Sequence, residues 1–212
     1  MAIASRSLKD LSPRLLQLYE QARDAYKGGN PQSAAAMLAT IVNEDPGCSD
    51  ARKALRAAQL DLFGERPHSL RRVLIALRTS WPLLVQAPAL LKQKKAIEAL
   101  ALAERVLAVD PGHRPSLLFL GKAADVAGLA QVGEDAVEVA VRLYPDDARC
   151  WRALADQCMK HGNGRRAVAA LRELRRRFPG DVELRAELNQ AKAIVAMGQE
   201  SWEKATKIDQ QS

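Results

Sequence analysis

The chain has 212 residues, of which 48% are hydrophobic and 27% charged, so it is long and apolar enough to bury a sizeable core and is not a disordered chain. Only 4% of the residues are aromatic, Ala and Leu are abundant and β-branched runs are scarce, which favours helices over strands. The formal net charge is +7.

We interpret residues 1–12 as an N-terminal extension. They contain no apolar run of the kind that forms a signal peptide. The chain has three cysteines, an odd number that is not typical of a disulfide framework. We therefore expect a cytoplasmic protein in a reducing compartment.

Prolines recur at a fixed distance along the chain. Pro111, Pro145 and Pro179 stand at equal intervals in the similar phrases "LAVDPGH", "RLYPDD" and "RRFPGD", and Pro46 lies close to two more such intervals upstream. This interval matches the period of about 34 residues that is typical of a repeat built from two antiparallel helices. Because the chain is also Ala-rich and helical in composition, the sequence predicts an all-α solenoid over residues 13–197.

The first repeat covers about residues 15–48. Ser12 followed by Pro13, and Asn30 followed by Pro31, each combine a capping side chain with a proline suited to the first helical turn, so they mark two helix starts. In this and later repeats a small residue on each helix allows the two backbones to approach closely. The expected pairs are Ala22 with Ala34, Ala87 with Ala99, Gly121 with Gly133, and Ala155 with Ala167.

The next two repeats depart from the pattern. Residues 49–79 form a degenerate repeat that lacks the turn glycine and has the longer connection "FGERPHS". An amphipathic helix completes it, with Leu70, Val73, Leu74, Leu77 and Trp81 on one face. In the irregular repeat 80–113, Lys94 occupies the turn position and Pro88 falls inside the first helix, where it should kink or break it.

Residues 114–147 and 148–181 form two regular repeats, with Gly128 and Gly162 at the turns that end their first helices. A capping helix is predicted over residues 182–197, starting after Asp181 as N-cap. Its apolar face carries Leu184, Leu188, Ala191 and Val195. Residues 198–212 are predicted to be a polar tail.

The repeated residues resemble the tetratricopeptide repeat (TPR) family. The matching positions are Trp151, Leu154, Ala155, Gly162, Ala167, Leu171 and Pro179 in one repeat, Leu117, Leu120, Gly121, Gly128, Gly133, Val137, Ala140 and Pro145 in the one before it, and Ala22, Gly29, Ala34, Leu38 and Pro46 in the first. The resemblance implies a right-handed superhelical solenoid of about five repeats plus the cap. It also implies a non-catalytic scaffold or adaptor without a cofactor.

In this family the first helix of each repeat lines a concave groove that binds a peptide or partner protein. The family's inward positions carry over to Tyr19, Arg23, Tyr26, Lys27, Leu118, Lys122, Asp125, Arg149, Arg152 and Asp156. Their mixture of Arg, Lys and Tyr suits a partner with some acidic character. The paired Asn residues of members that clamp a C-terminal carboxylate are absent at these positions.

A basic segment, residues 66–97, favours an alternative function. It contains no acid, and its seven basic residues account for the whole net charge: Arg66, Arg71, Arg72, Arg78, Lys92, Lys94 and Lys95. The charges and prolines leave no apolar run of about 20 residues, so the segment is not expected to span a bilayer. It could bind an anionic membrane surface or a nucleic acid instead.

Other polar groups have simpler interpretations. Cys150, Cys158 and His161 lack a fourth ligand, so we expect no metal site. The chain shows no catalytic motif, and the arginine-rich stretch from Gly164 is interpreted as a solvated helix face on which Glu173 pairs with Arg176 or Arg177.

Overall fold

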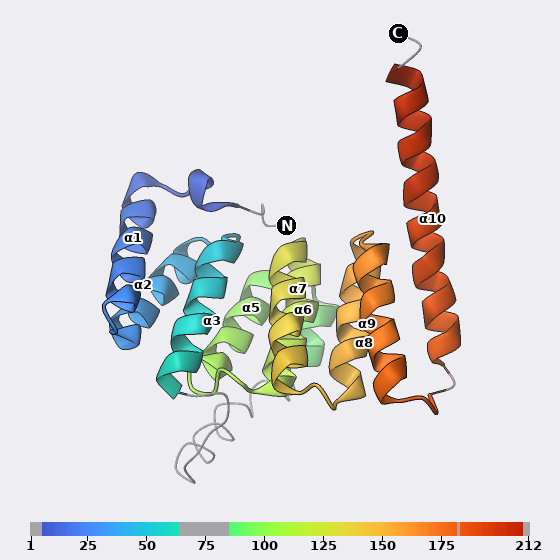
Figure 1. Ribbon diagram of the computed structural model, residues 1–212. Coiled ribbons are helices and arrows are strands. Elements are labelled where there is room, and N and C mark those ends of the chain that lie inside the picture. The colour runs from blue at the N-terminus through green and yellow to red at the C-terminus, as the bar shows by residue number, and fades with distance from the viewer. Residues whose placement is uncertain (1–5, 64–84, 182, 210–212) are drawn as a thin grey trace. The chain divides into compact units, whose positions relative to one another are not determined.

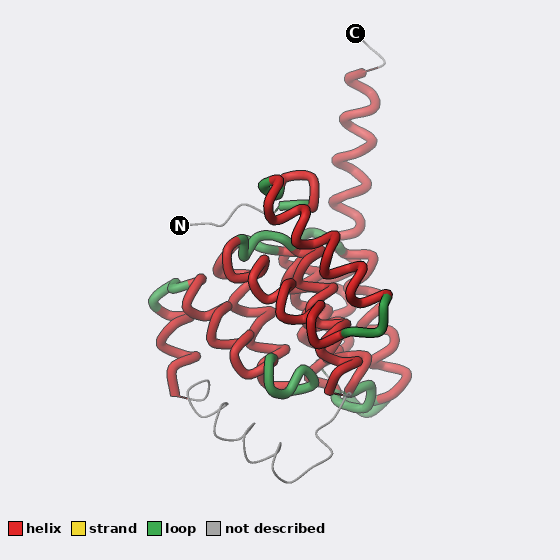
Figure 2. The backbone as a smooth tube through the Cα atoms, turned by 90° about the vertical axis from the view of Figure 1, so that its left-hand side faces the viewer, coloured by secondary structure: helices red, strands yellow, loops and turns green. Residues whose placement is uncertain are grey.

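The computed structural model describes residues 6–63, 85–181 and 183–209, and the side chains of these residues as far as Met197. In Figure 2 these residues form helices joined by loops, which confirms the all-α fold. The chain divides into two compact units, residues 1–143 and 144–212. Each unit is described by itself.

The first unit begins with a short 3-10 helix, Leu8–Asp10, and three helices that pack in sequence, α1 (Pro13–Lys27), α2 (Pro31–Glu44) and α3 (Ser49–Phe63) (Figure 1). The predicted caps are confirmed. The Ser12 side chain accepts a hydrogen bond from the Leu15 amide at 3.4 Å, and the Asn30 side chain accepts one from the Ser33 amide at 3.0 Å.

The same unit ends with three further helices, α5 (Ala96–Leu107), α6 (Arg114–Ala127) and α7 (Ala130–Leu143), in which α6 packs against both neighbours. Residues 85–92 are also helical, and Pro88 lies inside this run. The break expected at Pro88 is therefore not found in the described residues. The amphipathic helix predicted from Leu70 to Trp81 lies outside them.

The second unit consists of α8 (Ala148–Lys160), α9 (Gly164–Arg177) and α10 (Leu184–Asp209), packed in that order. The predicted apolar face of the closing helix is confirmed, since Leu184, Leu188 and Ala191 are at most 5% exposed in the core shared with α9. The helix begins at Leu184 rather than directly after Asp181. It also continues beyond residue 197, through most of the predicted tail.

The turns between paired helices use a left-handed backbone. Gly29, Gly128 and Gly162 have φ angles of 78°, 77° and 74°, as the sequence predicts for glycines that end a first helix. Lys94, at the same position of the irregular repeat, has φ of 56°. Because a side chain in this conformation brings Cβ close to the following carbonyl oxygen, Lys94 holds backbone strain that the glycines avoid.

Replacing Lys94 by glycine should therefore stabilise the protein. We expect Lys94→Gly to raise the free energy of unfolding by about 1 kcal/mol, measured by urea denaturation. Lys122→Gly is the matched control, because Lys122 is exposed on α6 in a right-handed helix, where glycine costs about 1 kcal/mol. A loss of stability in Lys94→Gly would contradict the strain argument.

The second unit contains one especially close approach between helices. A Cβ atom added to Gly164, at the start of α9, would lie 2.8 Å from Cγ2 and 2.9 Å from the amide nitrogen of Val195 on α10. It would also lie 3.0 Å from the Ala191 carbonyl oxygen. Since two of these neighbours are backbone atoms of α10, a side chain at Gly164 would displace the closing helix.

Gly164→Ala should destabilise the second unit by about 1–3 kcal/mol, the usual cost of overpacking a core. Thermal unfolding followed by circular dichroism measures the effect. Gly180→Ala is the control, because no atom lies within 4 Å of a Cβ added there. Equal midpoints for the two variants would show that α10 does not pack against α9 as described.

Candidate functional site

The four inward positions predicted on α1 divide into two groups. Tyr26 donates a hydrogen bond from its hydroxyl to the Asp61 carboxylate of α3, and this bond is the main cause of its raised pKa. Tyr19 is half-buried, and burial raises its pKa, with a smaller contribution from Asp50 of α3. Arg23 and Lys27 remain exposed. The two tyrosines thus face α3, while the two cations face solvent.

The inward positions predicted on α6 are less uniform. Leu118 and Asp125 are half-buried, whereas Lys122 is exposed. These three residues belong to the same unit as the α1 group. They add one exposed cation to its surface.

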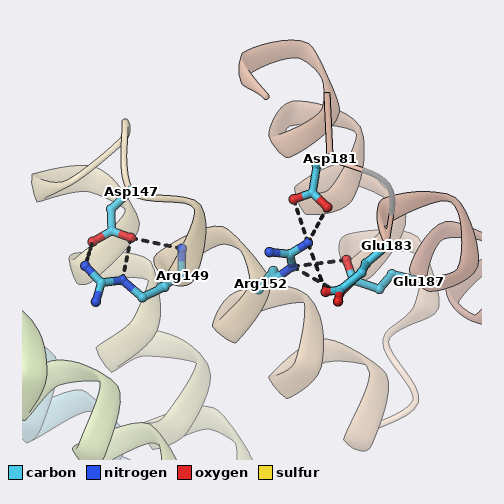
Figure 3. Close-up of polar contacts among 6 residues, drawn as sticks. All are labelled: Asp147, Arg149, Arg152, Asp181, Glu183 and Glu187. Carbon is cyan, nitrogen blue, oxygen red and sulfur yellow. Dashed lines mark hydrogen bonds and ion pairs between the residues drawn. The ribbon is translucent and has the colours of Figure 1, made fainter. Parts of the chain in front are cut away.

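In the second unit, the inward arginines of α8 bind carboxylates of their own unit (Figure 3). Arg149 folds back onto Asp147, with Nη2 3.0 Å from Oδ2, and Asp147 also caps the helix by accepting from the Arg149 amide. Arg152 donates to Asp181 at 2.6 Å and to Glu187 at 3.1 Å.

Glu183 is 3.6 Å from the Arg152 guanidinium, so three carboxylates surround this one cation. Arg152 therefore holds the connection between α9 and α10 in place. Its charge is already compensated within the unit. Asp156, the third predicted position on α8, is exposed.

The basic segment is only partly described. Lys92, Lys94 and Lys95 are exposed, and Lys95 lies 3.5 Å from Glu98. The four arginines Arg66, Arg71, Arg72 and Arg78 lie outside the described residues.

The arginine-rich face of α9 carries the pairing that the sequence predicts. Glu173 accepts from Arg176 at 2.6 Å and from Arg177 at 2.9 Å, and these bonds lower the pKa of Glu173 to about 2. Arg177 also lies over the Trp151 ring, 5.6 Å from its centroid. The predicted solvated face thus includes a local network that binds α9 to α8.

All three cysteines are buried, and none forms a disulfide. His161 is exposed at the end of α8. Within the described ranges, no group of three His, Cys, Asp or Glu side chains is placed to hold a metal ion.

A buried cluster of charges in the first unit was not predicted. Arg52 and Arg56 of α3, both 5% exposed, bind opposite oxygens of the Glu104 carboxylate on α5 at 2.5 and 2.8 Å. Arg52 also donates to the Pro46 carbonyl at 3.0 Å, and Arg56 to Gln59 at 2.5 Å. The two arginines are 52 and 48 positions away from Glu104 in the chain, so the cluster joins distant segments.

The sequence contains a signal for this cluster. Arg56 stands one full period of the repeat after Ala22, at the position where the regular repeats have a small residue. An arginine there cannot allow the close helix approach that a small residue permits. A long charged side chain at a position where the regular repeats have alanine or glycine therefore indicates that it binds an oppositely charged side chain in the interior.

Charge compensation holds the cluster together. Burial works to raise the pKa of Glu104, but the guanidinium groups of Arg56 and Arg52 outweigh it, so the pKa lies below its ordinary value. Glu104 therefore stays ionised in the fold at neutral pH. Its single charge faces two buried guanidiniums.

A cavity of about 340 Å³ adjoins the cluster, between α3, α6 and α7. Its wall combines apolar side chains with charged ones. The lining residues are Arg52, Lys53, Arg56, Ala57, Leu120, Val132, Asp135, Ala136, Glu138, Val139 and Arg142. Lys53 Nζ lies 3.1 Å from Asp135 Oδ1 across it.

The packed helix pairs, the left-handed turns and the regular period define a helical repeat protein. Models of the tetratricopeptide repeat match residues 84–148 and 148–191, which together span about half of the chain. The chain belongs to the tetratricopeptide repeat family. Neither match is to an enzyme family, and proteins of this family generally mediate protein–protein interactions.

Solved structures with a similar fold include a thermophilic TPR protein of Thermus thermophilus. That protein is 20% identical over 84% of this chain and 99% of its own, with a TM-score of 0.49. A MamA protein is 13% identical, and the match covers 91% of this chain and 88% of that protein's, with a TM-score of 0.43. A MamA protein of Desulfovibrio magneticus is 18% identical, and the match covers 81% of this chain and 98% of that protein's, also with a TM-score of 0.43. No curated protein matches the chain.

Within the described part of the chain, no helix combines the length and the apolar character needed to cross a bilayer.

Removing the charge of Glu104 should destabilise the first unit strongly, because it leaves two guanidiniums buried without a carboxylate. We expect Glu104→Gln to lower the free energy of unfolding by about 3 kcal/mol or more, measured by urea denaturation at pH 7. Glu98→Gln is the control on the same helix, since the Glu98 side chain is 59% exposed and its pair with Lys95 contributes little.

The pH dependence gives this prediction a second test. A lowered carboxyl pKa stabilises the fold above the unfolded value near 4.5, and that stability is lost as pH falls through the folded value. The difference in the free energy of unfolding between wild type and Glu104→Gln should therefore shrink as the pH falls below about 4.5 and through the lower pKa of folded Glu104. A difference that is small at pH 7, or unchanged in acid, would contradict the buried pairing.

Proposed function

We propose that this protein is a non-catalytic scaffold that binds a peptide segment of a partner protein on the face formed by α1 and α3. The observation that carries the proposal is the contact between Tyr26 and Asp61, which joins the first helices of consecutive repeats at a predicted inward position. Side chains on such a shared face are well placed to contact one extended segment.

The exposed charges of this face favour a partner with acidic residues. Arg23 and Lys27 are exposed on α1. Arg23 lies 3.5 Å from the exposed carboxylate of Asp24, a pair that contributes little free energy and leaves the guanidinium accessible. Tyr26, 37% exposed beside them, adds aromatic area suited to partner contact.

Reversing the charge of this face should weaken partner binding. We expect the double variant Arg23→Glu with Lys27→Glu to lower recovery of a discrete partner protein by about tenfold or more. The measurement is a pull-down with the tagged full chain from nuclease-treated lysate, quantified by mass spectrometry. The control is Arg105→Glu with Arg172→Glu, which makes the same change in net charge at exposed positions on the second helices of their pairs.

Equal losses in both double variants would contradict the proposal, because net charge alone would then explain them. Recovery of nucleic acid or lipid only, released by modest salt, would also contradict it. That result would favour the basic segment, residues 66–97, as the binding surface.

A further inference from the structure

The last two helices of the second unit pack through regularly spaced residues. Gly164, the first residue of α9, lies against Ala191 and Val195, which are far along α10, so the two helices run antiparallel (Figure 1). The residues of this contact recur at intervals of three and four positions. They are Gly164, Val168 and Leu171 on α9, and Leu184, Leu188, Ala191 and Val195 on α10.

The residue that follows each contact residue is rotated by about 100° around its helix, in the same sense on both helices. Because α9 and α10 are antiparallel, this rotation places the following residues of both helices on the same side of the pair. We call this surface the end face. It consists of exposed residues, which are Arg165, Ala169, Arg172 and Arg176 on α9, and Arg185, Asn189, Lys192 and Ala196 on α10.

Every charged residue of the end face is positive. Arg176 is paired with Glu173. The other cations form no ion pair with any residue that the structure describes, and they are Arg165, Arg172, Arg185 and Lys192. A polar end keeps a repeat array soluble, but charges of either sign serve that purpose. A face with charges of one sign favours an anionic partner.

The register of the repeat indicates that this partner is a helix. One period before three end-face residues of α10 stand residues of α8 that pack in the core shared with α9. These α8 residues are Trp151, Ala155 and Cys158, which precede Arg185, Asn189 and Lys192. The end face therefore includes the side of α10 on which, in the preceding repeat, a second helix packs.

The chain does not supply a second helix at this place within the described residues. Gly162 ends the pair's first turn with a left-handed backbone, but one period later stands Ala196, and α10 continues straight through it to Asp209. Alanine favours helix continuation, whereas glycine favours a turn. The place beside α10 thus stays available to a helix from another protein.

The spacing of the cations suits the side chains of such a helix. Arg165 and Arg172 are seven positions apart, as are Arg185 and Lys192, which separates each pair by about 10 Å along its helix. Acidic residues two turns apart on a third helix have the same separation. The short side chain of Ala169 allows that helix to approach closely, and guanidinium groups bind carboxylates through paired hydrogen bonds.

We propose that the end face binds an amphipathic helix of a partner protein whose charged residues are Asp and Glu. Its carboxylates pair with the cations of α9 and α10, and its apolar side packs in the shallow groove between these two helices. The end face belongs to the second unit, so this inference does not rest on partner binding at α1 and α3.

Fluorescence anisotropy with a labelled synthetic peptide tests the proposal on the full-length chain. The peptide has the 14 residues of α9's length, with leucine along one side of the helix and glutamate on both flanks. We expect saturable binding. A peptide with lysine in place of glutamate, and one with a central proline that breaks the helix, should each bind at least about tenfold more weakly.

A charge-reversed variant locates the site. Arg165→Glu with Lys192→Glu reverses one cation on each helix of the end face and should weaken binding of the glutamate peptide at least about tenfold. Arg23→Glu with Lys27→Glu is the matched control, because it changes the same residue types by the same net charge on α1. It should bind as wild type does, and circular dichroism checks that both variants fold.

Several results would overturn the proposal. Absence of saturable binding of the glutamate peptide by wild type is one, and equal affinity for the lysine or the proline peptide is another. Unchanged affinity in a folded Arg165, Lys192 variant would also do so. Loss of binding in the Arg23, Lys27 variant alone would assign the peptide to α1 and α3, and the proposed function would then stand without this inference. Displacement of the peptide by a short DNA duplex or by phosphatidylserine vesicles, at a lower concentration than by unlabelled peptide, would indicate a phosphate-bearing partner instead.

Discussion

The buried cluster of Arg52, Glu104 and Arg56 is the interaction on which the arrangement of the first unit depends. Two guanidiniums with 5% exposure would be prohibitively costly to bury without a carboxylate. Glu104 provides that carboxylate from α5, so α3 and α5 must be brought together for either arginine to be stable in the interior. Among the described residues, this cluster and the ion pair of Lys53 with Asp135 connect α3 to the later helices.

The same cluster explains why a cavity lies next to α3. In the regular repeats a small residue allows two helices to meet backbone to backbone, as the fully buried Ala22 and Ala34 do. Arg56 occupies that position in α3 and extends towards α5 instead. The neighbouring Ala57 is too short to fill the space towards α7, so a hollow remains that is lined by both charged and apolar side chains.

Features that repeat or act locally could be predicted from the sequence. The period of the prolines, the capping by Ser12 and Asn30 and the buried face of the closing helix all depend on residues within a few positions of one another, or on exact repetition. The partner of Arg52 could not be predicted, because Glu104 is 52 positions away and no local pattern links them. The length of α10 was also missed, since its sequence after Met197 is largely polar, and polar residues are also typical of a tail.

Internal pairing also decides which cations of the inward positions are available to a partner. The family pattern places both Arg23 and Arg152 among the inward positions of first helices. Arg152 is surrounded by Asp181, Glu183 and Glu187, so a ligand carboxylate would have to displace contacts that hold α10. Arg23 has one exposed neighbour and loses almost nothing when a partner replaces it. Inward cations of the array thus differ in how strongly they are held, because buried or half-buried carboxylates compensate Arg152 whereas the pair of Arg23 with Asp24 is exposed.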